Sequence, residues 1–177
     1  MHALTFTTTA AVALIATTSG YAIDYLTVEQ AQAALLPGRT LQASTLKLTP
    51  EQAKSVEKTS RARLRTREIR TWRADDGASF FVDEVLGKHE YITYAVALDS
   101  AGAVLGVEVL SYRESYGGEV RRPAWRAQFT GKTALAPLKL DEDIKNIAGA
   151  TLSSRHLAEG VKRILAVHDL LLASNAR

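Results

Sequence analysis

Three apolar runs occupy the middle of the chain and are separated by short polar turns. Residues 79–86 and 91–98 are rich in β-branched and aromatic side chains, and residues 104–110 follow the turn at 99–102. Runs of this composition and length are typical of neighbouring antiparallel strands. The pattern therefore predicts a β-meander.

Arginine recurs at every second position upstream of these runs, at Arg61, Arg63, Arg65 and Arg67. A strand would place these four side chains on one face. We expect a solvated edge strand there, because charged side chains protect a sheet edge from mispairing. An anion-binding or membrane-surface patch is the alternative.

Two segments near the N-terminus carry the signals of helix starts. Thr27 with Gln30 and Thr49 with Gln52 each fit a capping box, in which the two residues satisfy each other's backbone amide. We expect the first helix to end before the Pro-Gly pair that follows it, and the second to run to about Thr59.

The C-terminal segment has helical periodicity from about Ser154 to Ala173, with Ser153 and Ser154 as candidate N-caps. The residues on its apolar face are Leu157, Val161, Ile164, Leu165, His168 and Leu172. With the meander, these signals predict an α+β fold. We expect a twisted, mainly antiparallel sheet from about Arg63 to Tyr112, flanked by N-terminal helices and closed by the C-terminal helix.

Residues 1–22 contain no Asp, Glu, Lys or Arg and include a short apolar run at 10–16. They resemble a secretory signal peptide, with Gly20 and Ala22 as the small residues before a cut at about Ile23. An uncleaved N-terminal anchor is the alternative. We therefore predict a signal peptide over 1–22 and a single domain over 23–177.

The composition excludes several classes of site. The chain has no cysteine, so it has no disulfide, thiolate metal site or cysteine nucleophile. A net charge of +3 is too mild to favour a nucleic-acid partner. His89 beside Glu90 invites a metal site, but such a site needs three or four converging ligands, so we expect neither a metal ligand nor a catalytic residue here.

Small and hydroxylated residues precede the C-terminal helix. Gly149 permits backbone angles that are closed to other residues, and Ala150 adds little bulk beside it. Thr151 presents a hydroxyl where the unpaired amides of a helix start collect, which favours a phosphate ligand. Arg155 is the candidate phosphate partner. The alternative is a simple Ser-Ser helix cap after a tight turn.

The sequence Gly-Ala-Thr-Leu-Ser at 149–153 resembles the flavinylation motif of the FMN-binding domain family. This family includes subunits of the sodium-pumping NADH:quinone oxidoreductase and of the Rnf complex. Its motif threonine forms a phosphoester with FMN, so the resemblance implies covalent FMN on Thr151. The cofactor-binding residues implied in this loop are Gly149, Ala150, Thr151, Leu152 and Ser153.

Two further motifs resemble the same family. The segment 114–118 is similar to its Glu-x-x-Gly element, and 125–132 to its aromatic-x-x-Gln-Phe-x-Gly-Lys segment. The implied flavin neighbours are Glu114, Ser115, Tyr116, Gly117 and Gly118, with Lys132 near the polar edge of the ring or the phosphate side. Tyr116 or Trp125 would stack on the ring, and core packing is the alternative for Trp125.

The resemblance implies an exported, periplasmic electron carrier rather than a stand-alone substrate-converting enzyme. It also implies a separate flavin transferase that uses FAD as the FMN donor, and membrane or periplasmic redox partners. Association with the membrane would come from an uncleaved N-terminus or from a partner complex. The rival is a non-redox exported binding module that kept the fold without flavin. This alternative is favoured by two departures from the family motif. Ala148 stands where the family usually has Ser or Thr, and Lys145 where it usually has Asp.

Overall fold

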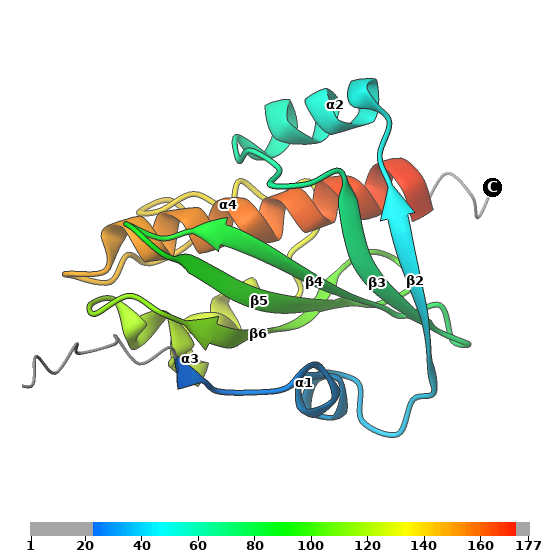
Figure 1. The fold of residues 1–177 in the computed structure, drawn as a ribbon, viewed down its shortest axis with the longest axis horizontal. Helices are drawn as coiled ribbons and strands as arrows, with labels where there is room; N and C mark the ends of the chain where they lie inside the picture. The colour runs from blue at the N-terminus through cyan, green and yellow to red at the C-terminus, as the bar shows by residue number, and fades with distance from the viewer. Residues whose placement is uncertain (1–22, 173–177) are drawn as a thin grey trace, which may run out of the picture.

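The computed structural model describes residues 23–172, which form an antiparallel sheet with helices on both faces (Figure 1). The strands, in the order β1-β6-β5-β4-β3-β2, are β1 (Ile23–Asp24), β2 (Leu41–Lys47), β3 (Glu68–Ala74), β4 (Ser79–Leu86), β5 (Tyr91–Leu98) and β6 (Val104–Tyr112). The α-helices are α1 (Val28–Leu35), α2 (Pro50–Ser60), α3 (Pro123–Arg126) and α4 (Thr151–Val167). Short 3₁₀ turns cover Gly118–Arg121 and Ala127–Phe129, and a π-helical turn covers His168–Leu172. The α+β prediction is confirmed, whereas the expected signal peptide lies outside the described residues.

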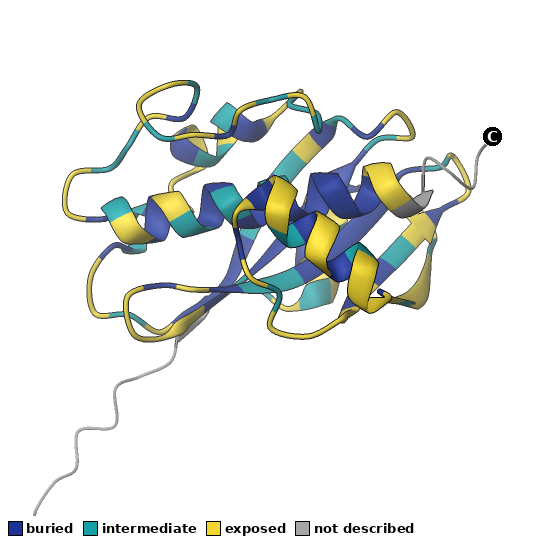
Figure 2. Ribbon diagram, turned by 90° about the horizontal axis from the view of Figure 1, so that it is seen from above, coloured by how far each residue is buried: buried dark blue, intermediate teal, exposed yellow. Residues whose placement is uncertain are grey.

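Two apolar clusters lie on opposite faces of the sheet. On one face α4 packs on β4 and β5, and α2 contacts α4. On the opposite face α1 packs on β5 and β6 (Figure 1). Successive side chains of a strand point to opposite faces, and Phe80 and Phe81 of β4 accordingly fall in different clusters. Figure 2 shows the central strands mainly buried and the helices banded between buried and exposed residues.

The two capping boxes form as predicted. Thr27 accepts a hydrogen bond from the amide of Gln30, whose side chain accepts one from the amide of Thr27. Thr49 and Gln52 make the same exchange. The second helix ends at Ser60, one residue beyond its predicted end. These helix starts depend on residues three apart in the sequence, which is why the sequence identifies them.

The meander is confirmed, but the strand predicted at Arg61–Arg67 is wrong. β3 begins at Glu68, and β2 lies outside it, so β3 is not an edge strand. Arg65 instead forms an ion pair with Glu84 and lies over the ring of Tyr91 at 4.4 Å. The segment is held by such tertiary contacts, which an alternating pattern does not reveal.

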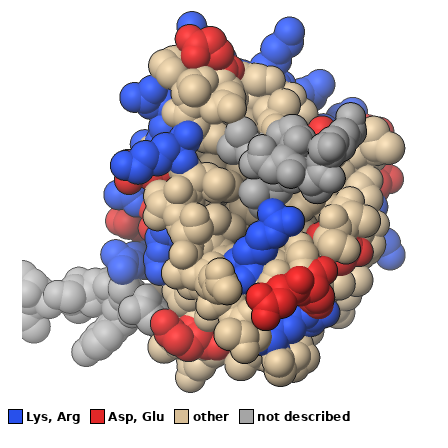
Figure 3. Space-filling view, turned by 90° about the vertical axis from the view of Figure 1, so that its right-hand side faces the viewer, with Lys and Arg blue, Asp and Glu red and all other residues tan. Residues whose placement is uncertain are grey.

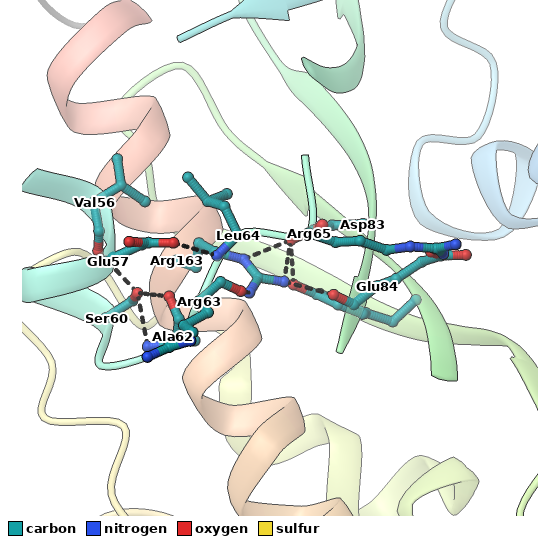
Figure 4. Close-up of polar contacts among 11 residues, drawn as sticks. Val56, Glu57, Ser60, Ala62, Arg63, Leu64, Arg65, Asp83, Glu84 and Arg163 are labelled. Atoms are coloured by element: carbon teal, nitrogen blue, oxygen red, sulfur yellow. Dashed lines mark hydrogen bonds and ion pairs between the residues drawn. The ribbon is translucent and has the colours of Figure 1, made fainter. Parts of the chain in front are cut away.

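A buried arginine fastens α4 to the sheet (Figure 4). Arg163 is 1% exposed and forms an ion pair with Asp83 at 2.6 Å. Its guanidinium also donates to the backbone carbonyls of Arg63 at 2.6 Å and Glu84 at 2.7 Å. The hydroxyl of Tyr94 donates to Asp83 at 2.9 Å. Burial, and then the charge of Asp83, raise the pKa of Tyr94, so this hydroxyl remains a donor.

Positive and negative side chains are interspersed on the face shown in Figure 3. This distribution suits the mild net charge of the chain and gives that face no continuous basic surface. Within residues 23–172, none of the helices combines the length and the hydropathy that a membrane span requires.

Candidate functional site

The start of α4 differs from the prediction. Gly149 adopts a left-handed conformation with φ of +82°, Ala150 is the N-cap, and Thr151 is the first helical residue. The left-handed turn lets the chain enter the helix three residues earlier than expected. Ser153 and Ser154 are therefore not caps but buried residues of the first turn. The predicted helix end at Ala173 lies outside the described residues.

The first amides of α4 have no side-chain cap among the described residues. The amide of Ser154 bonds the carbonyl of Ala150 at 2.9 Å, which leaves the amides of the three preceding helical positions without a partner within the helix. A Cβ added at Gly149 would meet no atom within 4 Å. Open space beside unpaired amides at the positive end of a helix suits an anionic group such as phosphate.

The hydroxyl of Thr151 is held from the preceding loop. Asn146 Nδ2 donates to Thr151 Oγ1 at 3.1 Å, and Asn146 Oδ1 accepts from the amide of Ile147 at 2.8 Å. The amide of Ala150 bonds the carbonyl of Ile147 at 2.9 Å. These bonds make the loop from Asn146 to Thr151 a single hydrogen-bonded turn.

Trp125 belongs to the core, which decides between the two interpretations of this residue. Its side chain is 7% exposed and packs edge-on against Phe129 at 5.3 Å. Its Nε1 donates to the carbonyl of Lys145 at 2.7 Å, and Gln128 Oε1 accepts from the amide of Lys145 at 2.8 Å. The 125–132 motif thus holds the loop that precedes Thr151.

The 114–118 motif reaches the first turn of α4. Tyr112 donates to the carbonyl of Tyr116 and lies 2.9 Å from Ser153 Oγ, which therefore acts as the donor in that second bond. Gly117 has φ of +91°, and a Cβ there would lie 2.9 Å from Ser153 Oγ and 3.4 Å from Ala150 Cβ. The two motifs that lie far apart in the sequence are in contact. Tyr116, in the middle of the 114–118 motif, is 84% exposed.

Glu114 holds a neighbouring turn. Its Oε1 accepts hydrogen bonds from the amides of His89 at 2.5 Å and Glu90 at 3.0 Å, across the β4–β5 turn. Burial raises the pKa of Glu114, but the hydrogen bonds from Glu90, His89 and Lys88 outweigh it and lower the pKa below the ordinary value. Ser115 next to it is exposed. Glu114 is thus an ionised anchor.

Lys132 does not lie with the residues of the 114–118 motif. Its backbone carbonyl pairs with the amide of Val104, the first residue of β6, whereas the 114–118 motif follows the last, Tyr112. The two segments therefore adjoin opposite ends of β6, a strand about 27 Å long at 3.4 Å per residue. The ammonium of Lys132 instead pairs with Asp143 at 2.9 Å.

Thr151 lines a cavity of about 570 Å³ between α4 and residues 137–142. Its charged lining is mixed and consists of Arg61, Lys139, Asp141, Glu142, Arg155, Glu159 and Lys162. Burial raises the pKa of Glu159 despite the cations nearby. Left-handed backbone conformations occur at three lining residues, Arg61, Leu138 and Asp141. Such conformations are costly outside glycine and tend to occur near ligand sites. The cavity itself gives Thr151 room beside it for a bound group.

Asn146 and Gln128 were not singled out from the sequence. The signal available for Asn146 was a side-chain amide five residues before the threonine, and for Gln128 its place inside the 125–132 motif.

Within the described residues, no group of three or more His, Cys, Asp or Glu side chains is placed to hold a metal.

Residues 87–166 match the FMN-binding domain family, which confirms the resemblance expected from the motifs. The chain is also similar to a subunit of the ion-translocating oxidoreductase complex of Stutzerimonas stutzeri, with 36% identity over 100 residues. That similarity covers 50% of this chain and 43% of the relative, so the chain matches less than half of the relative's length.

Proposed function

Taking the FMN-binding domain at residues 87–166 as the premise, we propose that this protein is an electron carrier that holds FMN as a phosphoester on Thr151. The observation that carries the proposal is the start of α4, where Thr151 stands beside uncapped amides and lines a cavity. FMN supplies one- and two-electron chemistry, and the protein supplies its position.

The residues that would hold the cofactor come from two loops. The amides at the start of α4 suit its phosphate, with Gly149 and Ala150 leaving space beside them. Gly118, where an added Cβ would have no neighbour closer than 3.8 Å, would allow the ring to approach the backbone, with Tyr116 exposed alongside. Gly117 supplies the left-handed turn that places this loop against α4. The hydroxyl of Tyr112 bonds both the carbonyl of Tyr116 and Ser153 Oγ, and this link between the loops supports one shared site.

The attachment needs a partner, because a threonine hydroxyl is not self-activating. We propose a flavin transferase that uses FAD: Thr151 Oγ1 bonds the FMN phosphorus, the pyrophosphate bond breaks and AMP leaves.

The proposed location is the periplasm, after export directed by residues 1–22, with redox partners on a membrane complex. The apolar run and the absence of charged side chains in residues 1–22 support export. The name of the similar protein, a subunit of an ion-translocating oxidoreductase complex, supports redox partners in a complex. N-terminal sequencing of exported protein should begin near Ile23, and a start at Met1 would favour an anchor.

Intact-mass measurement tests the attachment. Protein co-produced with a flavin transferase should be yellow and should gain the mass of FMN less one water. Thr151→Val should abolish the gain while Thr45→Val, at an exposed threonine of β2, should retain it. An unmodified, colourless wild type would reject the proposal and favour a binding module without flavin.

A further inference from the structure

Asn146 has one donor group free to act on Thr151. The amide hydrogen of Ile147 is donated to Asn146 Oδ1 at 2.8 Å, so this oxygen must face the backbone. The NH₂ group therefore faces Thr151 Oγ1, 3.1 Å away. The hydrogen-bond partners thus fix the orientation of the side-chain amide, which the positions of the heavy atoms alone would leave open.

Lys145, the residue before Asn146, is held at both its backbone amide and its backbone carbonyl. Trp125 Nε1 donates to the carbonyl of Lys145, and Gln128 Oε1 accepts from its amide. Gln128 Nε2 in turn donates to the carbonyl of Trp125 at 2.9 Å. Since Trp125 is buried, this clamp ties the loop to the core and gives Asn146 a fixed base.

We propose that Asn146 is a positioning residue that presents the Thr151 hydroxyl for modification, an inference that rests on the proposed function. A hydroxyl has one hydrogen to donate and lone pairs that accept. Because Asn146 donates to Oγ1, it holds the oxygen in one orientation and leaves the hydroxyl hydrogen for the base of the transferase. When Oγ1 bonds the phosphorus of the flavin dinucleotide and AMP leaves, that proton passes to the base.

Steady-state kinetics of modification test the proposal, with the full chain as substrate of a flavin transferase and FAD as donor. Asn146→Ala should lower kcat about ten- to a hundred-fold, the range expected for loss of alignment of a reacting group. KM for the chain should stay unchanged, because the docking surface is intact. Asn146→Asp keeps the acceptor for Ile147 and replaces the NH₂ donor with a charged oxygen that cannot donate, so it should also lower kcat.

Gln52→Ala is the matched control, because it removes a side-chain amide that caps α2, away from the loop. It should leave both constants unchanged, and urea unfolding should show that each variant is folded. A wild-type kcat in either Asn146 variant, or a change confined to KM, would overturn the positioning role while the proposed function stands. A wild type that gains no FMN would reject the proposed function itself.

Discussion

Arg163, in the middle of α4, and Thr151, at its start, have opposite surroundings. The guanidinium of Arg163 is buried and bonded to Asp83 and to two backbone carbonyls. At the start, the amides have no side-chain cap among the described residues, and the buried Ser154 Oγ has no hydrogen-bond partner there. The helix is therefore fixed by its middle, and its start retains polar groups for a ligand. Changes in the middle should alter stability, and changes at the start should alter cofactor attachment.

The largest effect on stability should come from Arg163→Met. It leaves Asp83 as an uncompensated charge that is largely buried, and should lower the free energy of unfolding by about 3–5 kcal/mol. Urea denaturation measures the change. Arg155→Met, at an exposed arginine near the start of the same helix, should change it by less than about 0.5 kcal/mol. Equal effects from the two variants would remove the contrast between the two regions.

Gly117→Ala should come next, because it affects the contact between the 114–118 motif and α4. The left-handed φ strains any side chain, and the new Cβ would lie 2.5 Å from the Tyr112 hydroxyl. We expect a loss of about 2–3 kcal/mol in the free energy of unfolding, and lower flavin retention. Gly149→Ala is the control, since it has a similar φ and open space, and it should cost about 1 kcal/mol. Equal costs in thermal unfolding would show that the contact contributes nothing.

Gly160→Ala returns to the middle of the helix. Its Cβ would lie 2.6 Å from the Tyr94 hydroxyl and 2.7 Å from Val85 Cγ1. The crowding should outweigh the better helix propensity of alanine and lower the free energy of unfolding by about 1–2 kcal/mol. Intact-mass measurement should show that flavin attachment at Thr151 is unchanged in this variant. A stabilised variant would mean that α4 does not pack closely on β4 and β5.

The smallest effect concerns pH and His168, just beyond α4. Burial, and then Arg73, lower the pKa of His168, against opposing effects of Asp99 and Asp169. The folded state therefore favours the neutral ring, so this stabilisation is present above the ordinary pKa of 6.5 and is lost as the pH falls below it. The free energy of unfolding should fall from about pH 7.5 to about pH 5.5 more in the wild type than in His168→Gln. Parallel curves would contradict the burial of a neutral His168.

Local signals were sufficient for part of the fold. The capping boxes join residues three apart, and the meander follows from consecutive apolar runs, so both could be predicted. β2 could not, because residues 42–45 are exposed and carry no alternation; pairing with β3 along its whole length makes it a strand. The arginines at 61–67 show the reverse error, where alternation is present without a strand.

The motif of the candidate site could be read from the sequence, but the contacts around that motif could not. Thr151 is a candidate from the sequence because Gly-Ala-Thr is a contiguous signal, whereas the contacts of Asn146 and Arg163 exist only after folding. An acidic residue in an apolar run, Asp83, was the available hint that a buried cation would face that strand. Long-range partners of this kind are set by topology rather than by local pattern.

The central claim, that the start of α4 carries FMN on Thr151, is tested most directly by tandem mass spectrometry of the modified protein. Trypsin cleavage after Lys145 and Arg155 releases residues 146–155, a peptide with one threonine and two serines. Fragment ions should place the mass of FMN less one water on Thr151. An unmodified peptide, or the same mass on Ser153 or Ser154, would contradict the account.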